Sequence, residues 1–199
     1  MGNVENELDF STEVSNLQLC RDFFEPYPSI YIPKVFPEFS SDRMVIMEYI
    51  HGIKVNDIPT LRKHGIHLSD VISLCMESFS RMIFQAGFLH VDPHPGNLMV
   101  RPIAHANGLV TPQLVILDHG MYNHAPEGFN TYMSELWLAM ISQDRTRVRE
   151  LCSVYGLERY SQMLAMMFTG RTLNSQNKYV IHQSSIINHQ SSFINHHSS

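Results

Sequence analysis

The feature that most restricts what this chain can fold into is a set of polar residues placed around two short apolar segments. Asp92 is followed five positions later by Asn97, and a second carboxylate, Asp118, comes after an intervening stretch. Residues 98–100 and 114–117 are apolar and rich in β-branched side chains, a composition typical of strands. Two paired strands would place Asn97 at the start of one and Asp118 at the end of the other. We therefore predict that these two side chains lie close together.

Phosphoryl transfer uses this combination of residues, because one Asp orients the attacking group while an Asn and a second Asp hold Mg²⁺. We predict that Asp92, Asn97 and Asp118 are catalytic, that Asn97 and Asp118 bind the metal, and that the cofactors are Mg²⁺ and ATP. Turn chemistry alone is an alternative, since Asp, Asn and Gly are common in loops, but it does not explain the joint spacing. His90 and His94 also suggest a zinc site, although a role in ordering the backbone is favoured.

Composition excludes several classes of function. The 199 residues have a formal net charge of −5 and no basic run, so nucleic-acid binding has no electrostatic support. The three cysteines are widely spaced and odd in number, which does not favour a disulfide framework. No apolar stretch approaches the ~20 residues that a membrane span needs, and we expect no transmembrane segment.

Periodicity and turn residues predict the elements of the fold. Helices are expected at 7–24, 67–86, 129–141, 145–155 and 158–168, and strands at 30–32, 34–36, 44–49, 98–100 and 114–117, with a loop at 101–113. Residues 5–172 are expected to form one domain. Residues 173–199 contain a seven-residue repeat of His, Ser and Asn, and we predict that this low-complexity tail is disordered.

Together these motifs resemble the UbiB/ADCK/aarF family of atypical protein-kinase-like proteins, and most closely its mitochondrial kinase-1-like branch. The motifs that support the resemblance are Glu7-Leu8-Asp9-Phe10 with Glu13 and Asn16, Met47-Glu48-Tyr49-Ile50-His51-Gly52, Asp92-Pro93-His94-Pro95-Gly96-Asn97, and Leu117-Asp118-His119-Gly120. The order and spacing agree across residues 5–172.

The resemblance implies further binding roles. Glu13 would be the helix glutamate that pairs with the ATP-holding lysine, and Met47, Glu48, Tyr49 and Ile50 would be the hinge against adenine. The glutamate side chain of the hinge could instead be a structural hydrogen-bonding group, with the backbone binding adenine. The resemblance also implies ATP and a lipid or ubiquinone precursor as ligands, and a mitochondrial location.

The resemblance also implies parts that this chain does not show. Residues 1–12 contain no lysine, and Lys34 comes after Glu13. The expected fold class is therefore α+β and protein-kinase-like, with a mostly helical C-lobe and a partial N-lobe sheet that lacks the lysine strand and the nucleotide-covering loop. We expect a fragment that is incomplete for catalysis.

Three functions remain open. The first is an ATP-dependent kinase or ATPase of this family, and the second is a nucleotide-binding or interaction remnant without catalysis. The third is a small-molecule kinase of the aminoglycoside or choline type, whose loops also have the pattern His-x-Asp-x4-Asn. The helix motif at Glu7–Phe10 and the hinge motif favour the first family over the third.

Overall fold

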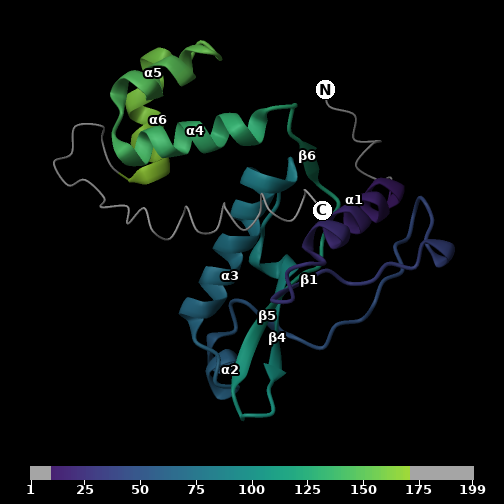
Figure 1. Cartoon of the computed structure of the whole chain (residues 1–199). Coiled ribbons are helices and arrows are strands. Elements are labelled where there is room, and N and C mark those ends of the chain that lie inside the picture. Colours follow the sequence, from purple (N-terminus) through teal and green to yellow (C-terminus); the bar gives the residue numbers. More distant parts are fainter. Residues whose placement is uncertain (1–9, 171–199) are drawn as a thin grey trace, which may run out of the picture. The chain divides into compact units, whose positions relative to one another are not determined.

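The computed structural model describes residues 10–170 of the chain (Figure 1). Contacts divide the chain into two compact units, of which one ends at Asn130 and the other begins at Thr131. Among the residues described, no helix is both long enough and apolar enough to cross a membrane.

The first unit begins with helix α1 (Phe10–Phe24), which stops just before Pro26. Proline lacks an N–H and disfavours helical conformation at the residue before it. Four residues of α1 are buried at helical spacing, namely Asn16, Leu17, Cys20 and Phe24. The predicted end of this helix is confirmed, whereas its predicted start at residue 7 lies outside the described residues.

A four-stranded sheet follows the order β1 (Ile30–Tyr31), β5 (Val110–Ile116), β4 (Leu98–Ala104) and β2 (Ile53–Lys54). Strands β4 and β5 form an antiparallel hairpin, from Leu98 opposite Ile116 to Ala104 opposite Val110. Strand β1 pairs with β5 in parallel, and β2 pairs with β4 antiparallel. A second small sheet pairs β3 (Phe88–His90) with β6 (Tyr122–His124). The hairpin is the longest paired element of the unit (Figure 1).

The hairpin strands are longer than predicted, so the predicted loop at 101–113 is wrong over most of its length. Pro102 lies opposite Pro112 within the strands. The backbone bonds His105 N–H to Leu109 O and Leu117 N–H to Asn97 O identify the hydrogen-bonded pairs of the ladder. Because such pairs alternate with non-hydrogen-bonded ones, the two prolines face each other where neither has to donate to the other strand.

The strands predicted at 34–36 and 44–49 are wrong. Val35 and Met47 form only an isolated antiparallel bridge. The strand predicted at 30–32 exists as the two residues of β1. This part of the chain is therefore extended but scarcely paired, apart from the 3-10 turn η2 (Pro37–Phe39).

Side chains explain why the bridge does not extend into a ladder. The Lys34 N–H donates to Glu48 Oε2 at 3.1 Å, and the Ile46 N–H donates to Ser40 Oγ at 2.9 Å. A regular ladder would pair both of these donors with backbone carbonyls. Prolines flank residues 34–36 on both sides and have no N–H to contribute.

The helix predicted at 67–86 is confirmed. It consists of α3 (Leu68–Arg81), followed without a break by a π-helical segment, η3 (Met82–Ala86). Gly87 ends it with φ +73°, in the left-handed region that a glycine adopts without strain. The short helix α2 (Ile58–Lys63), capped by Asp57, precedes it and was not predicted.

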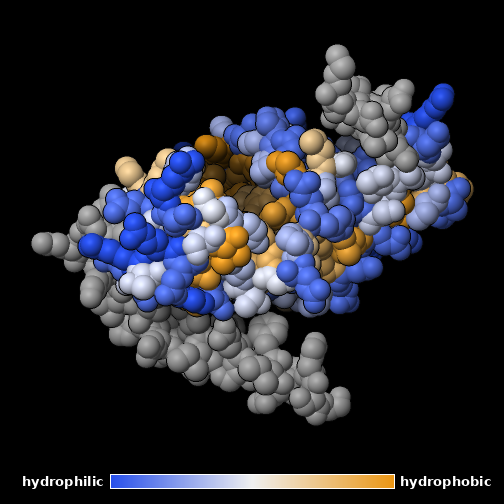
Figure 2. All heavy atoms as spheres, turned by 90° about the horizontal axis from the view of Figure 1, so that it is seen from above, coloured by the Kyte–Doolittle hydropathy of each residue, from blue (hydrophilic) through white to orange (hydrophobic). Residues whose placement is uncertain are grey.

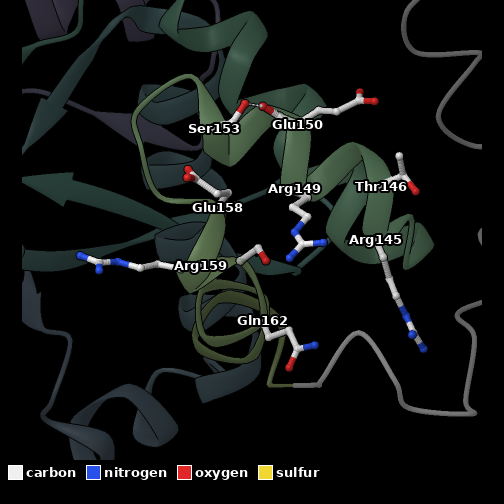
Figure 3. A pocket seen from close by; sticks show the side chains of 9 residues that line it. Arg145, Thr146, Arg149, Glu150, Ser153, Glu158, Arg159 and Gln162 are labelled. Carbon is white, nitrogen blue, oxygen red and sulfur yellow. Dashed lines mark hydrogen bonds between the residues drawn. The ribbon is translucent and has the colours of Figure 1, made fainter.

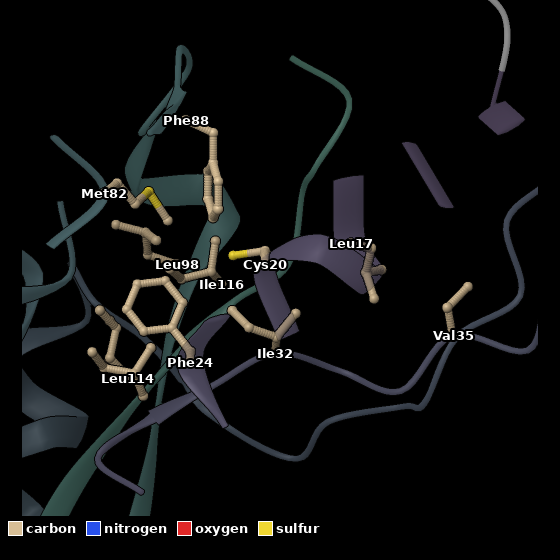
Figure 4. Close-up of a cluster of buried hydrophobic side chains, with 11 residues drawn as sticks. Leu17, Cys20, Phe24, Ile32, Val35, Met82, Phe88, Leu98, Leu114 and Ile116 are labelled. Atoms are coloured by element: carbon tan, nitrogen blue, oxygen red, sulfur yellow. The ribbon is translucent and has the colours of Figure 1, made fainter. Parts of the chain in front are cut away.

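The core of the first unit lies where α1, η3 and the hairpin meet (Figure 4). Its buried residues are Leu17, Cys20, Phe24, Ile30, Ile32, Val35, Met82, Phe88, Leu98, Leu114 and Ile116. The core therefore fixes the position of α1 relative to the strands that hold Asn97 and Asp118.

The second unit contains α4 (Phe129–Ser142), α5 (Arg145–Ser153), the 3-10 turn η5 (Glu158–Tyr160) and α6 (Ser161–Thr169), close to the predicted helices. Its buried residues are Leu136, Ala139, Met140, Val148, Leu151, Cys152 and Ala165. Three methionines of α6 are exposed instead, namely Met163, Met166 and Met167. On the face drawn in Figure 2, hydrophobic residues are interspersed with hydrophilic ones.

Candidate functional site

The hairpin brings Asn97 and Asp118 together at its open end. Asn97 directly precedes β4, and Asp118 follows β5 by two positions. The Leu117 N–H donates to the Asn97 carbonyl at 2.9 Å, which extends the ladder by one pair. The Asn97 amide Nδ2 then donates to Asp118 Oδ2 at 3.0 Å. The predicted proximity of the two side chains is confirmed, and strand register is its cause.

The loop before Asn97 is held by its own histidines. The Asp92 N–H donates to His90 Nδ1 at 3.2 Å, and the Gly96 N–H donates to His94 Nδ1 at 3.0 Å. A Cβ atom at Gly96 would lie 2.9 Å from that same His94 nitrogen, so a glycine fits this position. The 3-10 turn η4 (Pro95–Asn97) completes the loop. The prediction that both histidines order the backbone is confirmed.

Asp92 differs from the other two predicted catalytic residues in being exposed. Its carboxylate accepts no hydrogen bond from residues 10–170. It lies two positions from buried His90, on a loop whose end is fixed at Asn97. Asp92 thus lies on the loop that leads to the hairpin end, and its exposed carboxylate remains available to a ligand.

Both oxygens of the Asp118 carboxylate are oriented. Oδ2 accepts from Asn97, and Oδ1 accepts from the Gly120 N–H at 2.9 Å. A Cβ atom at Gly120 would come within 3.4 Å of Oδ1 and 4.0 Å of Glu13 Oε2. The glycine therefore sits between two carboxylates, one from the hairpin end and one from α1.

Two side chains of helix α1, Asn16 and Glu13, contact the residues around Asp118. The Asn16 Nδ2 donates to the His119 carbonyl at 2.9 Å in a buried position. Burial, followed by the charge of Asp118, raises the pKa of Glu13, while a hydrogen bond from the His119 backbone opposes the rise. The structure thus brings Glu13 to the predicted metal ligand.

The resemblance implies a lysine partner for Glu13, and none is found in the part of the chain that the structure describes. No ion pair there involves Glu13. The Lys34 ammonium lies 5.2 Å from the centroid of the Phe36 ring. The groups that the structure places beside Glu13 are Asp118, His119 and Gly120 at the hairpin end.

A buried network of polar groups around His119 holds the backbone next to Asp118. His119 is fully buried, its Nε2 lies 3.1 Å from the Ile116 carbonyl and its Nδ1 lies 2.8 Å from the Tyr122 hydroxyl. Since a carbonyl only accepts, Nε2 holds the proton and Nδ1 accepts from the tyrosine. Burial lowers the pKa of His119 to about 4, so the imidazole is neutral at pH 7. Burial likewise raises the pKa of the neighbouring Cys20 thiol to about 12, which keeps this thiol protonated.

Sequence reasoning gave no role to Tyr122 or Cys20. Tyr122 lies on β6, opposite His90 on β3, and its ring centroid is 5.3 Å from that of His90. Both rings also approach His119. No spacing pattern relates these residues in the sequence, because they meet only through the pairing of β3 with β6.

The predicted hinge residues lie against β1 and its neighbours. Glu48 Oε2 accepts from the Tyr31 hydroxyl at 2.6 Å. Burial would raise the pKa of Glu48, but this hydrogen bond, the one from the Lys34 N–H and nearby arginine charges outweigh it and lower the pKa. Ile50 is buried and Tyr49 is exposed. The Glu48 side chain is therefore engaged structurally, which favours the alternative in which the backbone of 47–50 would contact adenine.

None of the hydrogen bonds described joins the hinge residues to Asn97 or Asp118. The structure thus assembles two parts of the predicted site separately. One part contains Asn97, Asp118 and Glu13, and the other is the segment Met47–Ile50.

The donor set at the hairpin end fits a magnesium–nucleotide complex. Mg²⁺ prefers oxygen ligands and is commonly held by one or two protein side chains, with phosphates and waters completing an octahedron. Asp118 supplies a carboxylate, and Asn97 supplies a carbonyl oxygen that its own donor bond leaves unused. Within residues 10–170, no group of three or more His, Cys, Asp or Glu side chains is placed to hold a metal by itself. Such a site would accept the ion together with its phosphates.

Residues 2–152 match the family model described as the ABC1 atypical kinase-like domain. Relatives with similar sequences include AarF domain-containing protein kinase 1 of Xenopus laevis, 33% identical over 88% of this chain and 33% of its own length. The AarF domain-containing kinase 1 of Drosophila melanogaster is 36% identical over 85% of this chain and 32% of its own length. The chain thus spans about a third of the length of these relatives.

One solved structure with a similar backbone is the complex of Rv3197 with erythromycin from Mycobacterium tuberculosis. The match has a TM-score of 0.47 and 23% identity, and it covers 88% of this chain and 39% of that one. The family match includes all of the predicted site residues, from Glu13 to Asp118. With its α+β, kinase-like architecture, the chain belongs to the ABC1 atypical kinase-like family.

Proposed function

We propose that the end of the β4–β5 hairpin binds the Mg²⁺ and phosphates of ATP for phosphoryl transfer. The observation that supports this most directly is the hydrogen bond of 3.0 Å between Asn97 Nδ2 and Asp118 Oδ2. It orients two oxygen donors before any ligand arrives, and preorganised charge of this kind stabilises the transferred phosphoryl group. Mg²⁺, held there by Asn97 and Asp118, would neutralise part of the phosphate charge.

The residues at and beside the hairpin end have different roles in this proposal. Asp118 and Asn97 would hold the ion, while exposed Asp92 would orient the hydroxyl or water that attacks the phosphorus. His119 stays neutral and holds the backbone on which Asp118 depends, through the Ile116 carbonyl and the Tyr122 hydroxyl. Glu13 faces Asp118 from α1, and none of the ion pairs within residues 10–170 involves it.

Calorimetric titration of Mg²⁺–ATP into the whole chain tests the proposal, with Asp118→Asn as the variant. Asp22→Asn is the matched control, because Asp22 is an exposed carboxylate on α1 that makes no described contact with Asn97 or Asp118. Mg²⁺-dependent binding should be seen in the wild type and in the Asp22 variant and be lost in the Asp118 variant. Binding that is equal in all three proteins would refute the site.

A second candidate function is nucleotide binding without turnover. It is favoured by the position of Glu13, which lies beside the acidic Asp118 rather than in an ion pair with a lysine within residues 10–170. Loss of positive charge at the phosphates would remove much of the electrostatic stabilisation that transfer needs. Turnover of ATP, measured on the same samples as binding, separates the two functions.

The finer aspects of the function are proposed from family resemblance. We propose a mitochondrial location and a substrate linked to lipid or ubiquinone-precursor chemistry. Phosphate release with and without a phenolic ubiquinone-precursor mimic tests the substrate, with a choline-like alcohol as the comparison. Stimulation by the alcohol alone would instead favour a small-molecule kinase of the choline type.

A further inference from the structure

Two exposed apolar side chains, those of Val91 and Met121, lie opposite each other at the end of the second sheet. Strand β3 pairs with β6 as far as His90 opposite Tyr122. The Val91 N–H then donates to the Met121 carbonyl at 3.0 Å, which continues the ladder by one residue on each strand. Opposite residues of an antiparallel pair have their Cβ atoms about 5 Å apart on the same face. The two side chains, 45% and 52% exposed, are therefore neighbours.

Strand alternation turns this pair away from the core. His90 is buried. Successive side chains of a strand point to opposite faces, so Val91 and Met121 face outward. Leu89 and Asn123, which are paired two positions further along the strands, share this face. We call these four residues the outward patch, and none of them carries a charge.

The outward patch lies beside the polar groups of the hairpin end. Exposed Asp92 directly follows Val91 in the chain. Gly120 directly precedes Met121, and its N–H donates to the Asp118 carboxylate at 2.9 Å. Because successive Cα atoms are only about 3.8 Å apart, a ligand whose polar end contacts Asp92 reaches the outward patch with its next few atoms.

The cavity of the second unit offers a different kind of surface. It is formed by α5, η5 and α6, and every residue that lines it is polar or charged, including Arg149, Ser153 and Gln162 (Figure 3). A ligand with an apolar body would find no complementary surface there. Single exposed apolar residues are common on proteins, whereas ligand sites combine apolar surface with a few polar groups. The outward patch together with Asp92 provides that combination.

We propose that the outward patch is a specificity surface for the phosphoryl acceptor, and that this acceptor is a neutral alcohol with an aliphatic body. Its hydroxyl would lie at Asp92 and its carbon chain on Val91 and Met121. This inference rests on the proposed function, because it takes Asp92 as the residue that orients the attacking hydroxyl.

The transfer step that this acceptor would undergo is balanced. The alcohol oxygen would form a bond to the γ-phosphorus of ATP, and the bond from that phosphorus to the bridging oxygen of ADP would break. The hydroxyl proton would pass to the Asp92 carboxylate. The products are a phosphate ester, ADP and a proton.

The affinity for neutral alcohols should rise with the length of the carbon chain. Burial of a methylene group is worth up to about fourfold in affinity, so we expect about two- to fourfold for each methylene between 1-butanol and 1-hexanol. 1-Methoxypentane matches 1-hexanol in size but has no hydroxyl to donate to Asp92, and it should bind more weakly. Glycerol, a neutral alcohol without an apolar body, should bind more weakly than 1-butanol. Equal affinities across this series would overturn the proposal.

An NMR titration of 1-hexanol into the whole chain, without nucleotide, measures this binding. With ¹³C-labelled methionine methyl groups, Met121 and Met44 report separately. Met44 is the internal control, because its side chain is 51% exposed against 52% for Met121. We expect a saturable shift of the Met121 methyl signal and none at Met44. Equal shifts at both methyl groups would show non-specific binding and overturn the proposal.

Substitutions test whether the two side chains make the contact. Met121→Gln, read at the Val91 methyl signals, should weaken 1-hexanol binding by about threefold and flatten its dependence on chain length. Val91→Thr keeps the side-chain shape but replaces a methyl group with a hydroxyl, and should act in the same way. Met121→Leu should retain the wild-type affinity, and Met44→Gln should leave it unchanged. Unchanged affinity in both Met121→Gln and Val91→Thr would overturn the proposal, and melting temperatures report whether the variants fold.

The Mg²⁺–ATP titration of wild type and Asp118→Asn separates the failure of this inference from the failure of the proposed function. If Mg²⁺–ATP binding depends on Asp118 but 1-hexanol does not saturate, the acceptor surface is wrong and the nucleotide site stands. If 1-hexanol binds at Met121 but Mg²⁺–ATP does not bind, the proposed function is wrong and the outward patch has no acceptor role.

Discussion

The hairpin end and the hinge segment are both parts of one predicted nucleotide site, yet they are held in different ways. Strand pairing sets the hairpin end, from Leu98 opposite Ile116 to Ala104 opposite Val110, and the side chains of Asn97 and Asp118 follow from that register. The hinge segment has only the bridge of Val35 with Met47. Side chains such as Glu48 supply its remaining bonds. When strand register positions the residues of a site, their spacing in the sequence can predict the site. When side-chain hydrogen bonds position them, the spacing cannot.

The largest effect should come from removing a core contact under the hairpin. Leu114 is fully buried on β5, so Leu114→Ala should lower the free energy of unfolding by roughly 2–5 kcal/mol, the usual cost of such a cavity. Val35→Ala, at the residue that bridges to the hinge segment through Met47, should cost only about 1–2 kcal/mol because it removes fewer buried methyl groups. Urea denaturation of both variants measures the difference. A larger loss for Val35 would reverse the comparison.

The second effect concerns pH and the network behind Asp118. The folded pKa of His119 is about 4, below its ordinary value of 6.5, because burial disfavours the charged imidazole. The unfolded chain therefore binds the proton more readily, and the stability contributed by neutral His119 is present above pH 6.5 and is lost as the pH falls toward 4. The loss should reach roughly 3 kcal/mol.

His90 acts in the same direction, since burial also lowers its pKa. His119→Gln removes the titrating group, so the free energy of unfolding should depend less steeply on pH between 6.5 and 4 in this variant. Unfolding measured at several pH values checks the slope. An unchanged slope would show that His119 is not buried as a neutral imidazole.

The smallest effect should arise at the hinge. Glu48→Gln keeps one oxygen acceptor for the Tyr31 hydroxyl but loses the charge that strengthens both of its hydrogen bonds. The expected loss of stability is about 1 kcal/mol. Glu38→Gln is the matched control, because Glu38 is an exposed carboxylate of η2, outside the hinge segment. Equal stability of both variants would mean that Glu48 does not hold the segment.

The elements that could be predicted are those whose signal is local. The apolar stripe of helix α3 is followed by Gly87, and α1 ends shortly before Pro26. These local signals predict the C-terminal ends of both helical segments. The Asn97–Asp118 contact followed from two apolar runs of strand length.

The parts that could not be predicted depend on long-range packing. Pro102 and Pro112 argued for a loop, but the alternation of the ladder accommodates them opposite each other. The strands expected at 34–36 and 44–49 lose their ladder to side-chain acceptors. Tyr122 joins the network around His119 only because β6 pairs with β3.

The most direct test of the central claim is the position of the metal ion. Mn²⁺ replaces Mg²⁺ in many phosphate sites and broadens the NMR signals of nearby amides. With Mn²⁺–ATP added to the whole chain, the amide signals of Asn97 and Gly120 should broaden, and Asp118→Asn should abolish this effect. Unaffected signals at Asn97 and Gly120 in the presence of bound Mn²⁺–ATP would contradict the claim that the hairpin end holds the metal and its nucleotide.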